Sequence, residues 1–222
     1  MNLLEFARGP ALAVAVSLFV LGTAWRLLSI ARLRASRDLS RPRDGGVGVL
    51  RAVLAHLWPS TTLPRKTAGA SANALAWHMA LAIVIVGFAP HIQFVRKLTG
   101  VSWPAVSGWL FGAAVSVCFF GLAFALMMRL ASPVTRLLSR ADDYASWALT
   151  LGPFLTGMAA IYLPLDAPYP WIPEHPAAVA IHLLSAEALL AWLPFGKLAH
   201  AFLVFLSRGS TAASFAHKGA AT

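Results

Sequence analysis

The sequence predicts an all-α integral membrane protein, built as a bundle of five transmembrane helices. The 222 residues are 59% hydrophobic and 12% charged, with a mean hydropathy of +0.70. Five apolar stretches are close to or above the length of about 20 residues with which a helix crosses a bilayer. The basic residues gather between these stretches, so the net charge of +10 indicates membrane topology and not nucleic-acid binding.

The first stretch, from about 10 to 33, is predicted to be a retained helix. It is too long for the apolar core of a signal peptide and lacks a convincing cleavage site. Arginines crowd its C-terminal flank and continue into the polar segment 34–70. Since Lys and Arg accumulate on the cytoplasmic side, we expect this basic loop in the cytoplasm and the N-terminus outside.

Four more membrane helices are expected, at about 72–95, 106–130, 145–165 and 180–206. The loop between the last two (DAPYPWIPEHP) has no Lys or Arg, as expected of an outer loop. The alternation places the C-terminus in the cytoplasm, with a tail at 207–222 that we expect to be flexible or bound to a partner. No soluble catalytic domain fits into the remainder, so the chain alone is not expected to be a complete enzyme.

The fifth stretch carries His182 and His200, which are 18 residues apart. On one continuous helix this spacing is five full turns, so both rings would leave the same face, roughly 27 Å apart along the axis. Histidines in membrane helices usually have a function, and this pair suggests axial ligands of two stacked haems. Ser185, Ala186 and Gly196 share the face and would leave room for flat rings. The alternative is that these residues serve hydrogen bonds and close helix packing.

The second apolar stretch carries two histidines that could complete the two haem sites. By depth in the membrane, His78 matches His200 near the cytoplasmic side, and His91 matches His182 near the outer side. Two histidines on facing helices commonly hold a b haem in a helical bundle. His78 and His91 are 13 residues apart and point to different sides of an ideal helix. Either a kink at Pro90 turns His91 inwards, or His91 lies outside the haem pocket.

Other side chains support narrower expectations. The single cysteine lies in an apolar stretch, which excludes a CxxCH motif, so any haem here is b-type. Glu187 points away from the His182 face and is expected to make a buried hydrogen bond, with proton transfer or quinone contact as the alternative. Lys197 and Arg129 are candidates to meet haem propionates. Asp142 and Asp143 are expected to stabilise the N-terminus of the fourth helix.

Three segments carry a resemblance to a known family. They are WHMALAIVIVGF around His78, ADDYASWALTLGPFLTG at the fourth helix, and HLLSAEALLAWLPFGKLAH in the fifth. These segments resemble the gamma subunit of respiratory nitrate reductase, a membrane cytochrome b, and related subunits of sulfur-metabolism membrane complexes. The resemblance implies a multi-pass protein of the bacterial cytoplasmic (inner) membrane with two b haems. His78, His182 and His200 fall on the family's ligand positions.

The resemblance further implies that electrons pass between a membrane quinol and a cytoplasmic iron–sulfur subunit, which is joined to a catalytic subunit. The family has its second ligand of helix two ten residues after the first, following a glycine. Here Gly87 is followed by Phe88, and His91 stands three residues further on. Replacement by His91 and loss of the outer haem are both open. The implied quinone region on the outer side includes Gly87, Lys97 and His175.

The sequence therefore leaves two candidate functions. The first is quinol-linked electron transfer through b haem, with two haems or one. The second is a haem-free or monohaem membrane anchor that docks a cytoplasmic reductase of sulfur metabolism through its basic loop. A small proton-coupled carrier using Glu187 is disfavoured, because the five expected helices show no internal repeat.

Overall fold

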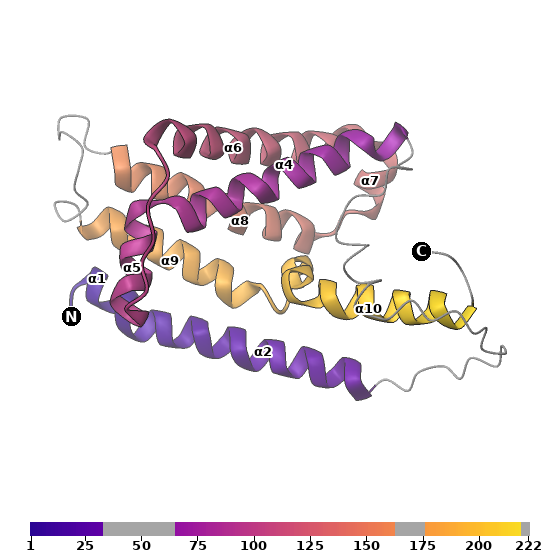
Figure 1. The fold of residues 1–222 in the computed structure, drawn as a ribbon, viewed down its shortest axis with the longest axis horizontal. Coiled ribbons are helices and arrows are strands. Elements are labelled where there is room, and N and C mark those ends of the chain that lie inside the picture. The colour runs from indigo at the N-terminus through magenta and orange to yellow at the C-terminus, as the bar shows by residue number, and fades with distance from the viewer. Residues whose placement is uncertain (33–64, 163–175, 219–222) are drawn as a thin grey trace. The chain divides into compact units, whose positions relative to one another are not determined.

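The computed structural model describes residues 1–32, 65–162 and 176–218 (Figure 1). Within these ranges the elements are helices, and no strand occurs. Contacts divide the chain into two compact units, one of residues 1–62 and 159–222, the other of residues 63–158. Most of the predicted cytoplasmic loop and the whole outer loop before α9 lie outside the described residues.

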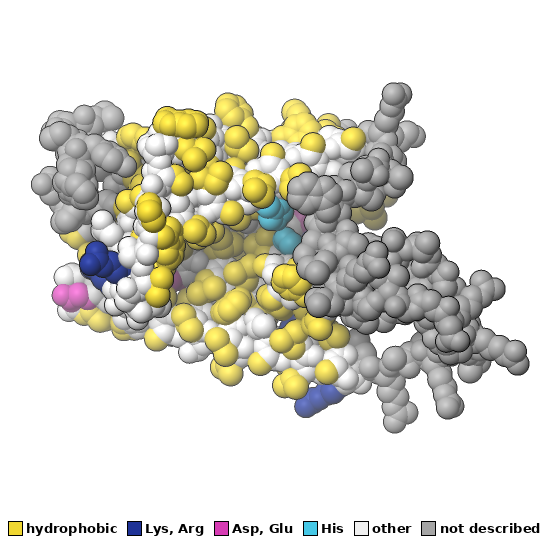
Figure 2. All heavy atoms as spheres, viewed as in Figure 1, with side chains coloured by type: hydrophobic (Ala, Val, Ile, Leu, Met, Phe, Trp, Pro, Cys, Tyr) yellow, Lys and Arg dark blue, Asp and Glu magenta, His cyan; other side chains and the backbone are white. Residues whose placement is uncertain are grey.

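The described part of the chain contains three helical segments long and apolar enough to cross a membrane: Leu3–Arg32, Ala68–Gly87 and Gly108–Ala131. A bent pair near the C-terminus, Pro176–Trp192 with Lys197–Thr211, brings the count to four if it is one span. Figure 2 shows hydrophobic side chains spread over the outer surfaces of the helices, as expected of lipid-facing surfaces. The all-helical membrane class is thus supported, whereas five spans and the orientation of the termini stay predictions.

The first unit begins with a nearly continuous helix. It runs through α1 (Leu3–Phe6), a π-helical segment η1 (Ala7–Ala11) and α2 (Leu12–Arg32). Asn2 and Glu5 form a capping box at its start, in which each side chain accepts from the other's backbone N–H at 2.8–2.9 Å. Helix α9 (Pro176–Trp192) packs along α2, as Figure 1 shows.

The predicted fifth helix is broken, which corrects the expectation of one helix over 180–206. After α9 come a turn, the short 3₁₀ helix η3 (Lys197–Ala199) and α10 (His200–Lys218), and the chain bends by 78°. Pro194 is the physical cause, since it has no N–H for the carbonyl of Leu190 and its ring clashes with the preceding turn. The argument that placed His182 and His200 on one face therefore does not hold.

The turn is packed against α2. A Cβ on Gly22 would lie 2.7 Å from Pro194 Cγ and 2.9 Å from Phe195 Cζ. A Cβ on Gly196 would collide with the indole of Trp192. Gly196 therefore serves the turn, and the expectation that it leaves room for a flat ring on the His182 face falls with the continuous helix.

The predicted tail is helical as far as Lys218, where α10 ends, and its flexibility or binding to a partner stays a prediction. The alanines and the absence of proline in this segment favour the helix.

In the second unit, α4 (Arg65–Gly87) packs along α6 (Gly108–Ala131). The buried residues at this contact form one cluster with a residue of α8 (Ala141–Tyr162): Ala80, Val84, Ala114, Val115, Cys118, Leu122 and Phe154. Two side chains of α4 donate to carbonyls of α6, Asn73 Nδ2 to Gly121 at 3.1 Å and Trp77 Nε1 to Cys118 at 3.1 Å. Cys118 is fully buried, as expected of a small packing residue.

Replacing Gly121 by leucine should separate these two helices. A Cβ at this position would lie 2.8 Å from Trp77 Cδ1 and 3.2 Å from Asn73 Oδ1. We expect the variant to lose about 1–3 kcal/mol of unfolding free energy, measured by denaturation in mixed micelles. Gly112→Leu in the same helix is the control, because no atom lies within 4 Å of a Cβ there. Equal stability of the two variants would contradict the tight contact at Gly121.

The predicted second helix also breaks, at Phe88, which has extended backbone angles (φ −79°, ψ 126°). Helix α5 (Ala89–Thr99) follows, with Pro90 in its first turn, so the span expected over 72–95 ends at Gly87. Three downstream groups bind the last four carbonyls of α4, which a helix end leaves unpaired. His91 Nδ1 lies 3.1 Å from the oxygens of Val84 and Ile85. Trp103 Nε1 donates to Val86 at 2.8 Å, and the backbone N–H of Val106 donates to Gly87 at 3.0 Å.

The short helix α7 (Pro133–Leu138) leads to α8, the expected fourth helix, which is not among the segments that qualify as spans by length and hydropathy. Asp143 Oδ2 accepts from the backbone N–H of Arg140 at 2.9 Å, which confirms that it stabilises the helix start. Its other oxygen forms an ion pair with Arg129 at 2.9 Å. Arg129 also donates to Ser139 Oγ at 2.9 Å. The structure thus gives Arg129 a protein partner where the sequence suggested a propionate.

Candidate haem-ligating histidines

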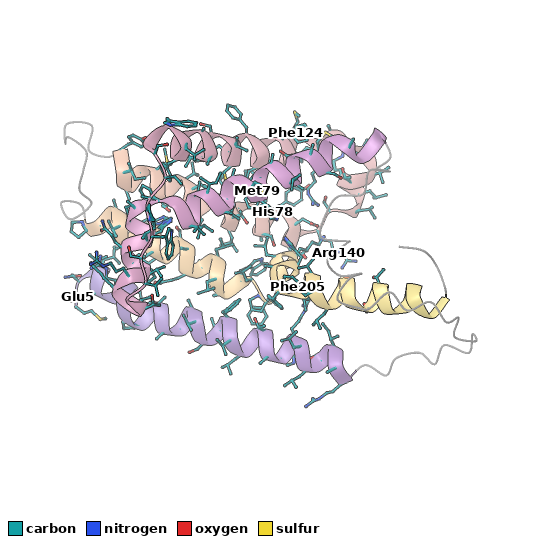
Figure 3. All side chains as sticks on the ribbon, in the orientation of Figure 1. Glu5, His78, Met79, Phe124, Arg140 and Phe205 are labelled. Carbon is teal, nitrogen blue, oxygen red and sulfur yellow. The ribbon has the colours of Figure 1, made fainter. Side chains whose placement is uncertain are left out.

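His78 lies on the exposed surface of α4 (Figure 3). Its Nδ1 is 2.6 Å from the carbonyl oxygen of Ala74, one turn earlier. A carbonyl only accepts, so this contact places the proton on Nδ1 and the lone pair of the neutral ring on Nε2. Histidines that bind metal are usually held in this way by a second hydrogen bond.

His200 begins α10, directly after the turn at Pro194. Its Nδ1 is 3.0 Å from the carbonyl oxygen of Lys197, which again leaves the lone pair on Nε2. The residue lines a cavity of about 610 Å³ within the first unit, together with Arg26 and Lys197. Two cationic side chains therefore border the same space as the imidazole.

His91 lies in the first turn of α5, and its Nδ1 faces two carbonyls of α4. Burial lowers the pKa of this imidazole, and the hydrogen bonds to the carbonyls of Val84 and Ile85 oppose that effect in part. The neutral ring is the form that can bind a metal ion. Joining α4 to α5 is a structural role for His91 that the sequence did not suggest.

His182 is half-buried in the second turn of α9, and its backbone carbonyl accepts from Ser185 Oγ at 2.8 Å. It belongs to the first unit with His200, whereas His78 and His91 belong to the second. The pairs His78–His200 and His91–His182 each join residues of different units, so both pairs stay predictions.

The structure describes two of the three residues of the expected quinone region, Gly87 and Lys97. Gly87 is buried, and a Cβ there would lie 2.7 Å from Val106 Cγ1. Lys97 is exposed in the last turn of α5. His175 lies outside the described residues.

In the part of the chain that the structure describes, no three His, Cys, Asp or Glu side chains gather as a metal site would require. An axially ligated haem needs two such ligands.

Sequence reasoning missed Arg26 as a site residue. The signal was present in the sequence, because an arginine inside an otherwise apolar membrane stretch usually faces a cavity or a partner. That Arg26 lines the same cavity as His200 could not be foreseen, since it depends on the bend between α9 and α10 at the turn of Pro194. Phe19 of α2 and Phe202 of α10 meet edge to face there, with ring centroids 6.4 Å apart.

Comparison with curated proteins finds a relative in Nitratidesulfovibrio vulgaris (strain Hildenborough). It is 25% identical over 224 aligned residues, which cover 98% of this chain and 96% of the relative. The similarity extends over the whole chain and carries no statement of function. No known protein family and no solved structure matches the chain. The likeness to the nitrate reductase gamma subunit thus rests on the residues quoted above.

Proposed function

We propose that this chain is a b-type cytochrome subunit of the bacterial inner membrane. It carries electrons between a membrane quinol and a cytoplasmic iron–sulfur subunit, which serves a separate catalytic subunit. The observation that carries the proposal is the state of the histidines: in three of the four, Nδ1 is fixed by a backbone carbonyl. In the neutral ring this hydrogen bond places the lone pair that can bind a metal on Nε2, and it limits rotation of the ring. When bound, b haem supplies a one-electron carrier.

The cavity beside His200 fits the charge of such a group. A b haem carries two propionates, and Arg26 and Lys197 offer positive charge at the same cavity as the imidazole. The cavity volume of about 610 Å³ lies in the range of cofactor pockets. His200 and His78 would hold the inner haem, and His182 with His91 the outer one.

The direct test is the haem content of the purified chain in detergent, by reduced-minus-oxidised spectra and the pyridine haemochrome method. The proposal requires at least one b haem per chain, and two if both pairs bind. Well-folded protein without haem, after expression with sufficient haem supply, would overturn the proposal.

A second candidate is a monohaem or haem-free anchor that docks a cytoplasmic sulfur-metabolism reductase. The hydrogen bonds of His91 to the end of α4 favour it, because they explain this residue without an outer haem. One haem in the wild type, unchanged in a folded His91→Gln variant, would support the monohaem form.

The cations at His200 predict a shift in reduction potential. Arg26→Gln removes a positive charge that favours the reduced haem, so we expect a lower midpoint potential. The shift should be on the order of tens of millivolts, the Coulomb effect of one charge across a cavity roughly 10 Å wide at an effective dielectric constant of about 20. Redox titration monitored at the α band measures it. Arg32→Gln, at the exposed end of the same helix and outside the cavity, is the control. Equal potentials in both variants would contradict the placement of a haem in this cavity.

A further inference from the structure

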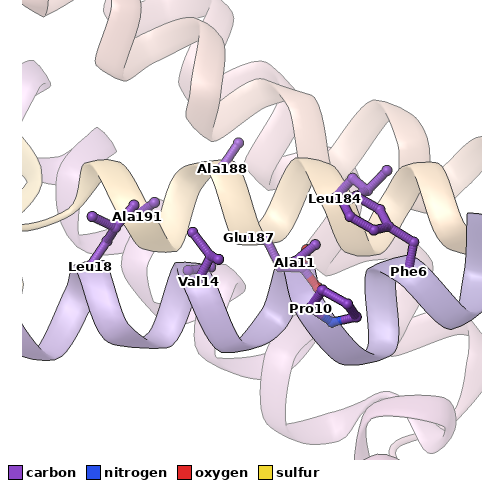
Figure 4. Close-up of a pocket in the computed structure, with 10 residues that line it drawn as sticks. Phe6, Pro10, Ala11, Val14, Leu18, Leu184, Glu187, Ala188 and Ala191 are labelled. Atoms are coloured by element: carbon purple, nitrogen blue, oxygen red, sulfur yellow. The ribbon is translucent and has the colours of Figure 1, made fainter.

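The N-terminal helix and α9 border a pocket of about 320 Å³ inside the first unit. All lining residues except Glu187 are Ala, Val, Leu, Phe or Pro. Figure 4 shows Phe6 and Pro10 on one helix and Leu184 and Ala191 on the other. No Lys or Arg is among the lining residues, so the walls offer no charge to an anionic group.

Glu187 is the polar feature of this pocket. The residue is 8% exposed, and its Oε2 is buried with no hydrogen-bond partner among the residues that the structure describes. In Figure 4 its side chain extends from α9 towards Pro10 and Ala11. Buried polar atoms in native proteins are nearly always hydrogen-bonded, so an oxygen of this kind indicates a partner from outside the described part of the chain.

The wall opposite Glu187 is irregular. Pro10 and Ala11 belong to the π-helical segment η1, and the proline contributes no N–H to the helix. Single π-turns inside α-helices often occur at functional sites. This irregular wall faces the carboxyl group of Glu187 across the pocket.

We propose that this pocket binds the ring of a lipid-soluble quinol, with the Glu187 carboxyl group as its hydrogen-bond partner. A phospholipid head group carries a phosphate that no cation of the pocket would neutralise, and an acyl chain cannot hydrogen-bond to the carboxyl group. A neutral ring with hydroxyl groups satisfies both the apolar walls and the unpaired oxygen, and the side chain of Phe6 offers it a stacking surface. The choice of a quinol among neutral ring compounds rests on the proposed electron transfer. This site differs from the region of Gly87, Lys97 and His175.

The test uses the full-length chain in lipid nanodiscs and a photoreactive azidoquinone with a short isoprenoid tail. After illumination, mass spectrometry of peptides locates the label. We expect label on residues 3–18 and 184–191, suppressed by an excess of the unmodified quinone. Glu187→Leu removes the hydrogen bond and should lower the labelling yield about tenfold, whereas Glu187→Gln should retain most of it.

Thr23→Val is the matched control, because Thr23 Oγ1 is also buried without a partner in the described ranges but lies outside the pocket. Its labelling should equal that of the wild type. Label spread evenly over the helices, or competed by phospholipid as well as by quinone, would overturn the proposal in favour of a lipid site. Haem content is read from the same samples. Normal haem with no specific label refutes the quinol pocket alone, whereas specific label without haem refutes the proposed electron transfer alone.

Discussion

If both histidine pairs bind haem as proposed, replacing His200 by alanine should reduce the haem content of the chain from two b haems to one. His200 and His78 are expected to hold the inner haem together, and the loss of either axial ligand should release it. His78→Ala should therefore give the same loss. The haem-to-protein ratio, from pyridine haemochrome spectra of purified variants, measures the effect. Phe205→Ala, at an exposed position of the same helix, should keep both haems.

Double variants identify which two histidines bind the same haem, and they do so without any distance between the histidines being known. If His78 and His200 share a haem, the variant lacking both should still hold one haem, since the same group is lost twice. A variant lacking His78 and His182 should hold none, because each substitution removes a different haem. The opposite pattern, with the first double variant empty and the second retaining one haem, would show that the pairs are assigned wrongly.

His91 needs a separate control, because its ring also binds the end of α4. His91→Ala removes both the expected ligand and the hydrogen bonds to Val84 and Ile85. His91→Gln keeps an N–H donor and is no axial ligand for haem. Loss of one haem in the glutamine variant, with unchanged thermal stability, would establish ligation. Retention of both haems would limit His91 to its structural role.

Arg129→Met should destabilise the second unit by about 1–3 kcal/mol, because it leaves the buried carboxylate of Asp143 without its charge partner. The Asp143 side chain is 2% exposed and the Arg129 side chain is 38% exposed, so water can replace the guanidinium only in part. The backbone N–H of Arg140 would remain as a hydrogen-bond donor to this carboxylate. Denaturation in mixed micelles, followed by circular dichroism, measures the loss.

Two further variants test this ion pair. Arg136→Met, at an exposed position of α7, should change the unfolding free energy by less than about 0.5 kcal/mol. In a double-mutant cycle, Arg129→Met combined with Asp143→Asn should cost less than the sum of the single substitutions, because the amide removes the uncompensated charge. Additive losses would show that the two side chains act independently.

The sequence determined the class of this protein. Length and hydropathy were sufficient to predict the candidate membrane helices Leu3–Arg32 and Gly108–Ala131, because a membrane helix depends on the sum of its apolar residues. The helix-stabilising role of Asp143 was also predictable, since an acid in the first turn binds a backbone N–H three residues earlier. The b-type character of any haem follows from the single cysteine.

The tertiary structure decided where helices break. Pro10 and Pro153 lie inside helical segments, whereas Pro90 and Pro194 accompany breaks. A proline leaves a carbonyl unpaired wherever it occurs, and a membrane helix tolerates this when nearby groups satisfy the backbone. At the end of α4, the last carbonyls accept hydrogen bonds from donors of His91, Trp103 and Val106. Such donors come from later in the chain, so the sequence of one helix cannot show whether it continues. At Pro194 the chain bends between α9 and α10, so the face that the spacing predicted for His182 and His200 on one continuous helix is absent in the fold.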